Sequence, residues 1–203
     1  SQDAAATLHR FESHDEAIDW ARKNLKTAID YDSLRKPGLD ILSDTLMAIQ
    51  EFEQRLGRRI PAAIVEFSGK GLGPRRTGQF DYGSRVMRLR PFGSNEYWEK
   101  EVSENAKWSG RSRGVPFTIG SNQRALVWHE AGHAVDAAIE RSGTGFISSN
   151  GTRLDFSNLS AYANTKNEEA WAESFAAIAT GVRAEFVPPE VAANIRRILK
   201  EDK

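Results

Sequence analysis

The residues best suited to chemistry lie together at positions 129–133, which read His-Glu-Ala-Gly-His. Residues four apart in a helix share one face, with β-carbons roughly 5–6 Å apart, so His129 and His133 could bind one metal ion. Glu130, the next residue around the helix, could then reach a water molecule beside that ion as a general base, without being a ligand. The spacing therefore predicts a metal-assisted hydrolytic site, and it has the H-E-x-x-H form that zinc peptidases use.

A catalytic zinc site needs a third protein ligand and an open position for water. Glu169 and Glu173 lie four apart in a helical pattern of apolar residues. A carboxylate in such surroundings is costly unless it has a partner. We therefore expect one of them to bind the metal and the other to accept a proton from the free ring nitrogen of a ligand histidine. The residues alone leave open which carboxylate has which role.

The cofactor follows from the available donors. The chain of 203 residues has no cysteine and four histidines, so thiolate ligands and disulfides are excluded. Two imidazoles and one carboxylate favour zinc over other divalent ions, at one ion per chain.

Two helices must position these side chains. Apolar residues on both sides of the first motif predict a helix that is capped by Ser121 and runs through Glu140. Gly132 within it costs about 1 kcal/mol of helix stability relative to alanine, which indicates that a side chain is unwelcome there. The second helix is expected to be capped by Asn167 and to end at Gly181.

The second motif carries a family resemblance. The run from Tyr162 to Phe175, Tyr-Ala-Asn-Thr-Lys-Asn-Glu-Glu-Ala-Trp-Ala-Glu-Ser-Phe, combines with the first motif over about residues 121–181. Together they resemble the gluzincin peptidases of the anthrax lethal factor catalytic domain and the clostridial Pro-Pro endopeptidases. In that family a tyrosine lies seven residues before the glutamate ligand, and the glutamate begins a Glu-x-x-x-Glu turn followed by an aromatic residue.

The resemblance assigns roles that the spacing left open. It implies that Glu169 is the metal ligand and that Glu173 supports the metal site from behind the ligands. It also implies that Tyr162 donates a hydrogen bond to the tetrahedral intermediate of peptide hydrolysis. Asp136 matches a family aspartate, and we expect it to support the helix or the site. The activity so implied is that of a zinc metalloendopeptidase with a peptide or protein substrate.

The fold expected around the site is mainly helical α+β, zincin-like, with a small mixed β-sheet. We expect an N-terminal helical segment over 1–38 and the metallopeptidase domain over 39–203. The individual predictions are a helix capped by Ser13, a helix over 39–56 that ends at Gly57, a buried strand over 60–67, a loop over 69–78, a half-exposed edge strand over 85–90, a polar helix over 94–107, loops over 109–120 and 142–160, and a final helix from Pro188.

A bound peptide is expected to lie extended beside the strand over 85–90. Val86, Arg88 and Arg90 alternate on one side of that strand. An edge strand offers unpaired main-chain groups to an added peptide strand, so these three residues are the predicted substrate contacts.

Other partners follow from charge and hydropathy. Lys plus Arg equals Asp plus Glu at 28 each, but residues 57–124 hold 13 basic and 6 acidic side chains. A nucleic-acid reading rests on Arg75, Arg76, Arg85, Arg88, Arg90, Arg111 and Arg113. Only three aromatic residues, Phe80, Tyr82 and Phe92, are interleaved with them, which is too few for a base-stacking platform.

We therefore expect no nucleic-acid partner. No membrane partner is expected either, because no apolar run approaches the roughly 20 residues that span a bilayer. The competing class is a non-catalytic attachment domain of a larger phage or toxin protein that retains the zinc site. The absence of cysteine and the resemblance to exported peptidases favour export of the protein.

Overall fold

The computed structural model describes residues 10–73, 76–96, 100, 115, 116, 118, 119, 122–151 and 153–200. Within this part the chain is mainly helical α+β with a small mixed sheet, which confirms the predicted fold class. The helices are α1 (His14–Asn24), α2 (Leu39–Leu56), α4 (Gln123–Ala138), α5 (Ser142–Asn150), α6 (Asn167–Thr180) and α7 (Pro189–Leu199), and the strands are β1 (Ile64–Phe67), β2 (Gly78–Phe80) and β3 (Val86–Leu89).

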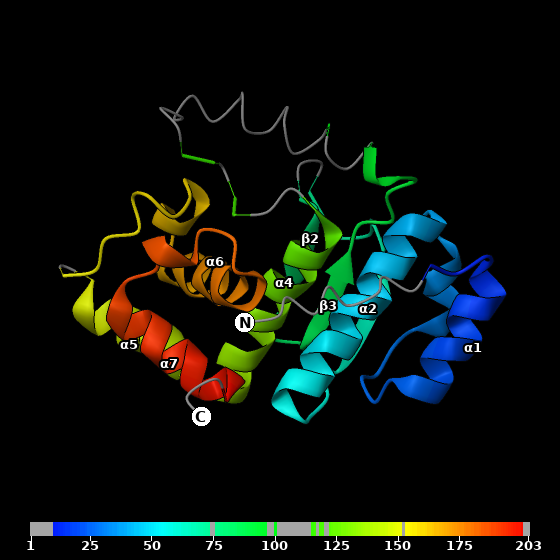
Figure 1. The fold of residues 1–203 in the computed structure, drawn as a ribbon, viewed down its shortest axis with the longest axis horizontal. Coiled ribbons are helices and arrows are strands. Elements are labelled where there is room, and N and C mark those ends of the chain that lie inside the picture. The colour runs from blue at the N-terminus through cyan, green and yellow to red at the C-terminus, as the bar shows by residue number, and fades with distance from the viewer. Residues whose placement is uncertain are drawn as a thin grey trace, which may run out of the picture.

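Helix α4, which carries the first motif, lies at the centre of the molecule (Figure 1). The sheet and α2 pack against it on one side, and α6 packs against it on the other. Helix α1 covers α2, while α5 and α7 pack against α6. The two helices predicted to supply the metal ligands are therefore neighbours at the core.

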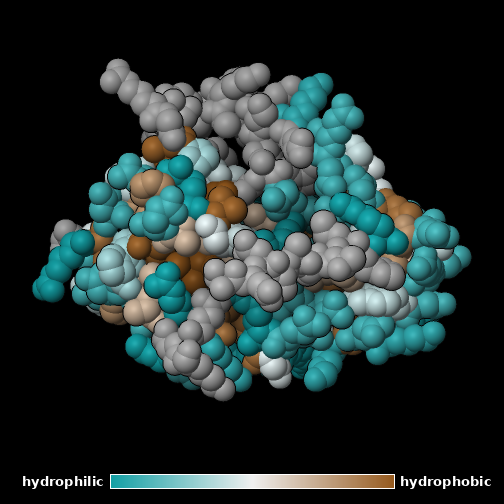
Figure 2. Space-filling model, in the orientation of Figure 1, coloured by the Kyte–Doolittle hydropathy of each residue, from teal (hydrophilic) through white to brown (hydrophobic). Residues whose placement is uncertain are grey.

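One buried apolar cluster joins these elements. It contains residues from α1 through α7, on both sides of the boundary predicted after residue 38, and that boundary stays a prediction. Hydrophilic side chains predominate on the face seen in Figure 2, as expected when apolar side chains are collected inside. Among the described residues no helix is both long and apolar enough to cross a bilayer.

The first two helices form where their sequence signals predict. Ser13 caps α1 by accepting a hydrogen bond from the backbone N–H of Glu16 at 3.2 Å. Helix α2 ends at Gly57, whose φ of 66° is the left-handed conformation that glycine adopts without strain. Apolar residues three and four apart in α2 are buried, so this helix is held by its packed face.

The sheet has the order β1-β3-β2, and this corrects the predicted edge strand. Strand β3 pairs in parallel with β1 and antiparallel with β2, so both of its edges are used. The edge strands are β1 and β2. The edge position was predicted because apolar and polar side chains alternate along β3. That alternation shows only that one face of the sheet is partly exposed, and it does not show whether the strand lies at an edge.

Two further predictions need correction. Strand β1 starts at Ile64, not at Ile60 as predicted. Pro61 has no backbone N–H, so it cannot donate a hydrogen bond within the sheet. Nine residues of the predicted loop over 142–160 form helix α5 instead. Asp136 accepts hydrogen bonds from the N–H and the hydroxyl of Thr144, which satisfies a donor in the first turn of α5.

The N-caps of the two helices that carry the site lie one residue away from the predicted cap positions. Asn122 caps α4 by accepting from the N–H of Ala125 at 2.9 Å, and α4 ends at Ala138. Lys166 precedes α6 without a side-chain cap, and the helix ends at Gly181 as predicted. The final helix begins at Pro189, one residue after its predicted start at Pro188, which is the N-cap. Most of the helix predicted over 94–107 and of the loop over 109–120 lies outside the described residues.

Helices α4 and α6 approach most closely at Gly132. A β-carbon there would lie 3.0 Å from the β-carbon of Phe175 and 3.2 Å from the α-carbon of Ala172. The indole N–H of Trp171 donates a hydrogen bond to the carbonyl of Gly132 at 3.0 Å. A glycine between the two motif histidines is thus required by the helix contact, as the sequence indicated.

Replacing Gly132 by alanine is expected to destabilise the fold, because the added methyl group meets backbone as well as side-chain atoms. Overpacking of this kind costs about 1–3 kcal/mol of unfolding free energy, more than the helix propensity of alanine returns. Gly145→Ala is the matched control, since a β-carbon at this exposed position of α5 meets nothing within 4 Å. Urea denaturation should show a loss for the first variant and none for the second; equal stability of the two would contradict the packing argument.

Candidate metal centre

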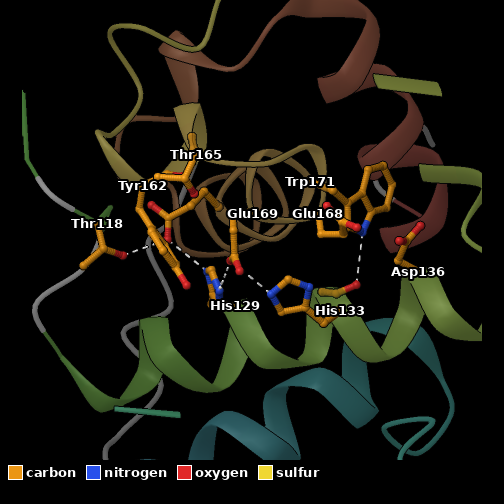
Figure 3. A network of polar contacts seen from close by, with 12 residues as sticks. Thr118, His129, His133, Asp136, Tyr162, Thr165, Glu168, Glu169 and Trp171 are labelled. Atoms are coloured by element: carbon orange, nitrogen blue, oxygen red, sulfur yellow. Dashed lines mark hydrogen bonds and ion pairs between the residues drawn. The ribbon is translucent and has the colours of Figure 1, made fainter. Parts of the chain in front are cut away.

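Three predicted ligands meet between α4 and α6. His129 and His133 lie one turn apart on α4, and Glu169 reaches them from the first turn of α6 (Figure 3). One carboxylate oxygen of Glu169, Oε2, lies 3.2 Å from the Nε2 atom of each histidine. A ligand atom from each residue falls within 4.8 Å of the other two, so all three can face one cation.

The donor set fits a divalent metal. Burial raises the pKa of Glu169, but contacts with the two histidines outweigh it and hold that pKa well below its usual range, so the group is a carboxylate. Two imidazoles and one carboxylate are the ligands of many catalytic zinc sites. Glu173 is not in this set, and the geometry therefore supports Glu169 as the third ligand.

Glu130 lies beside the three ligands and is not one of them. Its side chain is 4% exposed, and its Oε2 atom has no hydrogen-bond partner among the described residues. Burial raises the pKa of Glu130, and the nearby histidines lower it only in part. A buried acceptor without a partner costs free energy, which is expected where a group is reserved for a ligand or water.

Strand β2 holds Glu130 in place. The backbone N–H of Phe80 lies close enough to the carboxylate of Glu130 to lower its pKa. A β-carbon at Gly78 would lie 2.9 Å from Oε1 of Glu130, so only glycine leaves room for it. Strand β2 thereby encloses Oε1 of Glu130, whereas Oε2 has no hydrogen-bond partner among the described residues.

Glu173 supports His129 from behind, the role that the resemblance implied. Its carboxylate is fully buried, and Oε1 lies 2.9 Å from Nδ1 of His129. It also accepts hydrogen bonds from the hydroxyl of Thr118 at 2.7 Å and the N–H of Ile119 at 2.9 Å. Two donors thus hold this carboxylate in place against the ring of His129.

Tyr82 supports His133 in the same way, and the sequence analysis missed this role. Its hydroxyl lies 3.0 Å from Nδ1 of His133, and the two rings pack edge to face. Burial and nearby carboxylates raise the pKa of Tyr82, so the phenol stays protonated. When Nε2 of His133 holds a metal, Nδ1 carries the ring proton and donates it to the phenol oxygen.

The turn between β2 and β3 brings Tyr82 to α4. Asp81 accepts hydrogen bonds from the N–H and hydroxyl of Ser84, which hold the turn closed. The guanidinium of Arg141 lies 4.8 Å from the centre of the Tyr82 ring and is paired with Glu168. The run Asp81-Tyr-Gly-Ser84 is a recognisable turn signal, but only the fold shows which histidine the tyrosine meets.

Tyr162 closes the other side of the site. It lies in a short 3-10 turn (Tyr162–Asn164), and its ring stacks on His129 with centroids 5.8 Å apart. Burial, followed by the charges of Glu169 and Glu130, raises its pKa, so its hydroxyl is protonated and able to donate. A hydrogen bond to Glu169 holds this hydroxyl close to the ligand set.

The remaining predicted residues lie elsewhere. Asp136 is fully buried and is bonded to Thr144, so it joins α4 to α5. Arg88 is paired with Glu66 on β1 at 2.9 Å. Val86, Arg88 and Arg90 do not line the pocket around the metal ligands. Because the backbone of β3 is paired on both sides, the structure does not bring these three residues to a peptide as predicted.

A pocket of about 230 Å³ opens over the site. Its floor is formed by the ligands with Glu130, and strand β2 and the start of α6 form its walls. The lining residues are Arg76, Gly78, Gln79, Phe80, Tyr82, His129, Glu130, His133, Tyr162, Lys166, Glu168 and Glu169.

Comparisons of the chain with protein-family models, with curated proteins and with solved structures found no match. What can be said of the site therefore rests on its own geometry. The chain has a buried pair of histidines and a glutamate that could hold a metal ion, with the H-E-x-x-H spacing.

Replacing Tyr82 by phenylalanine is expected to weaken zinc binding by about tenfold, because the ring remains but the acceptor for Nδ1 of His133 is lost. Competition with a chromogenic chelator gives the dissociation constant. Tyr31→Phe serves as the matched control, since this ring lies near Arg22 and away from the site. His133→Ala should abolish tight binding, and an unchanged constant for the Tyr82 variant would remove Tyr82 from the metal site.

Proposed function

We propose that the protein is a zinc-dependent endopeptidase in which Glu130 is the general base. The observation that carries this proposal is the convergence of His129, His133 and Glu169 beside the unpartnered, buried oxygen of Glu130. Both features face an open pocket of about 230 Å³ rather than a closed interior. A purely structural metal site would need no such reserved acceptor, because structural zinc is enclosed by four protein ligands.

Different residues of the chain act in different steps of the proposed hydrolysis. Bound zinc would acidify a water molecule and polarise the carbonyl of the scissile bond. Glu130 takes a proton from the attacking water as its oxygen bonds to the carbonyl carbon, and gives that proton to the amine nitrogen as the C–N bond breaks. The raised pKa of Glu130 suits a group that must both accept and return a proton near neutral pH.

Tyr162 donates a hydrogen bond to the carbonyl oxygen as negative charge develops on it. Its hydroxyl is protonated, partly buried and next to the ligand set, which are the properties that such a donor needs. In the ground state this hydroxyl bonds Glu169, so it must turn towards the substrate oxygen during the reaction. A side chain that rotates about one bond can make this change without backbone movement.

The peptide lies along β2 in this proposal, in place of β3. One edge of β2 pairs with β3 and the strand has no second partner in the sheet. Gly78, Gln79 and Phe80 line the pocket, and alternate residues of an antiparallel pair direct their backbone groups to the open edge. An extended peptide can add there by main-chain hydrogen bonds, with its scissile bond over the ligands.

The spacing of Tyr162, Glu169 and Glu173 supports placing the protein with gluzincin peptidases. Each residue stands where that family would use it, as hydrogen-bond donor, ligand and support for a ligand histidine. The nucleic-acid reading has less support among the described arginines, since Arg88 is paired with Glu66 and Arg90 with backbone carbonyls.

Glu130→Gln is the decisive test. It should keep one zinc ion per chain but lower the rate of peptide cleavage by about 10²–10⁴-fold, because an amide cannot accept the proton from water. Cleavage of a diverse peptide library, read by mass spectrometry, measures this, with zinc content determined on the same samples. Exposed Glu185→Gln is the matched control.

Two outcomes would overturn the proposal. Cleavage at the parent rate by the Glu130 variant would show that Glu130 is not the base. A zinc-loaded parent protein that cleaves no member of the library would favour the competing class, a non-catalytic attachment domain that retains the metal.

Tyr162→Phe is expected to lower kcat by about 10²–10³-fold while KM changes little, since the hydroxyl acts chiefly on the charge that forms in the transition state. Steady-state kinetics on a fluorogenic peptide from the library separate the two constants. Tyr31→Phe should leave both unchanged. An unaltered kcat in the Tyr162 variant would remove this hydroxyl from the mechanism.

A further inference from the structure

Two positively charged side chains line the pocket without an assigned role. Arg76 lies just before β2 and Lys166 just before α6, so they come from the two walls. Both side chains are exposed. Within the part of the chain that the structure describes, neither forms an ion pair with a carboxylate.

The carboxylates of the pocket are already engaged. Glu168 is paired with Arg141, and Glu169 lies between the two histidines. Glu130 is buried on the floor, against Gly78 of β2. The mouth of the pocket therefore carries two positive charges that form no ion pair among the described residues, although Lys166 also acts at longer range on Glu168.

The backbone that carries Arg76 is held in place by Arg90. The guanidinium of Arg90 donates to the carbonyl of Arg76 at 2.7 Å and to that of Gly73 at 2.6 Å. The N–H of Arg90 also donates to the carbonyl of Thr77 at 2.8 Å. Arg90 thus positions Arg76 without facing the pocket itself, and a fixed backbone reduces the entropy lost when the Arg76 side chain binds a ligand.

Arg76 also lies near the reacting groups. Its side chain lines the same pocket as Tyr162, Glu130 and the three predicted ligands. Lys166 follows Tyr162 by four residues, on the same side of the pocket. A group bound between the two cations would be close to the bond that is cleaved.

We propose that Arg76 and Lys166 select peptides that carry a carboxylate close to the scissile bond, either on an Asp or Glu side chain or at a C-terminus that lies a few residues beyond that bond. The planar guanidinium forms paired hydrogen bonds with a carboxylate, and the ammonium adds a second positive charge. The inference rests on the proposed peptidase function and names the substrate class of the same site.

The test uses a peptide cleaved by the parent protein, made with Glu or with Gln at each position next to the scissile bond, and with a free or amidated C-terminus. The carboxylate form is expected to have a kcat/KM about tenfold higher than its amide counterpart, the low end for a charge-assisted pair at an exposed site. The preference should weaken as salt is raised. Which arm shows the preference tells whether a side chain or the C-terminus supplies the carboxylate.

Substitutions of Arg76 and Lys166 test whether these two residues cause the preference for a carboxylate. Arg76→Gln should reduce the preference to within about threefold, and Lys166→Gln should reduce it in part. Arg59→Gln, at an exposed site outside the pocket, should keep it. Fluorescence anisotropy of the same labelled peptides with the Glu130→Gln protein measures the preference in binding, without turnover.

The failures of the two proposals are distinct. If the parent protein cleaves no peptide, the peptidase function fails. If it cleaves Glu and Gln peptides equally well in both C-terminal arms, or if Arg76→Gln keeps the full preference, the carboxylate subsite is wrong while the peptidase stands.

Discussion

The close packing of α4 against α6 is the constraint on which the site depends. With no side chain at Gly132, the two helices approach within van der Waals contact of Ala172 and Phe175. The hydrogen bond from Trp171 to the carbonyl of Gly132 fixes the rotation of α6 about its axis. Because Glu169 lies one turn before Ala172 and Glu173 just after it, this rotation points both carboxylates at α4. A wider spacing would withdraw Glu169 from the histidines and leave buried charge without a partner.

The packing of α4 against α6 buries carboxylates, and hydrogen bonds to these carboxylates offset the free-energy cost of burying their charge. Burying a carboxylate is unfavourable by several kcal/mol unless donors surround it. Glu173 has donors from Thr118 and Ile119 and lies 2.9 Å from the ring of His129, and Asp136 has two donors from Thr144. Glu130 differs, since one of its oxygens has no partner in the described chain. Glu173 and Asp136 therefore have structural roles, whereas Glu130 retains an oxygen that can accept a hydrogen bond from a ligand or water.

Much of this could be predicted from the sequence because the signals are local. The spacing of His129 and His133 within a helix places both on one face of it. Gly132, between them, indicated that another part of the chain packs closely against this helix. The role of Tyr82 could not be predicted, since it depends on a hairpin turn meeting a helix 51 residues later. Strand β3 was misplaced for the same reason: side-chain alternation shows which face is open, but pairing partners are set by the tertiary fold. Helix α5 forms through Asp136 and packing against Trp171, which local propensity does not report.

In the proposed peptidase, the groups that carry out the chemistry and those that recognise the substrate reside on different elements. The ligands and Glu130 belong to two buried helices, whose packing leaves little freedom to change. Strand β2 and the segments beside it supply the open edge, Tyr82 and Arg76, and they meet α4 at Glu130 and His133. Side chains such as Arg76 that project from the wall can change without disturbing the helix contact. Substrate preference in this fold is therefore free to vary while the metal site is held constant by the packing of α4 on α6.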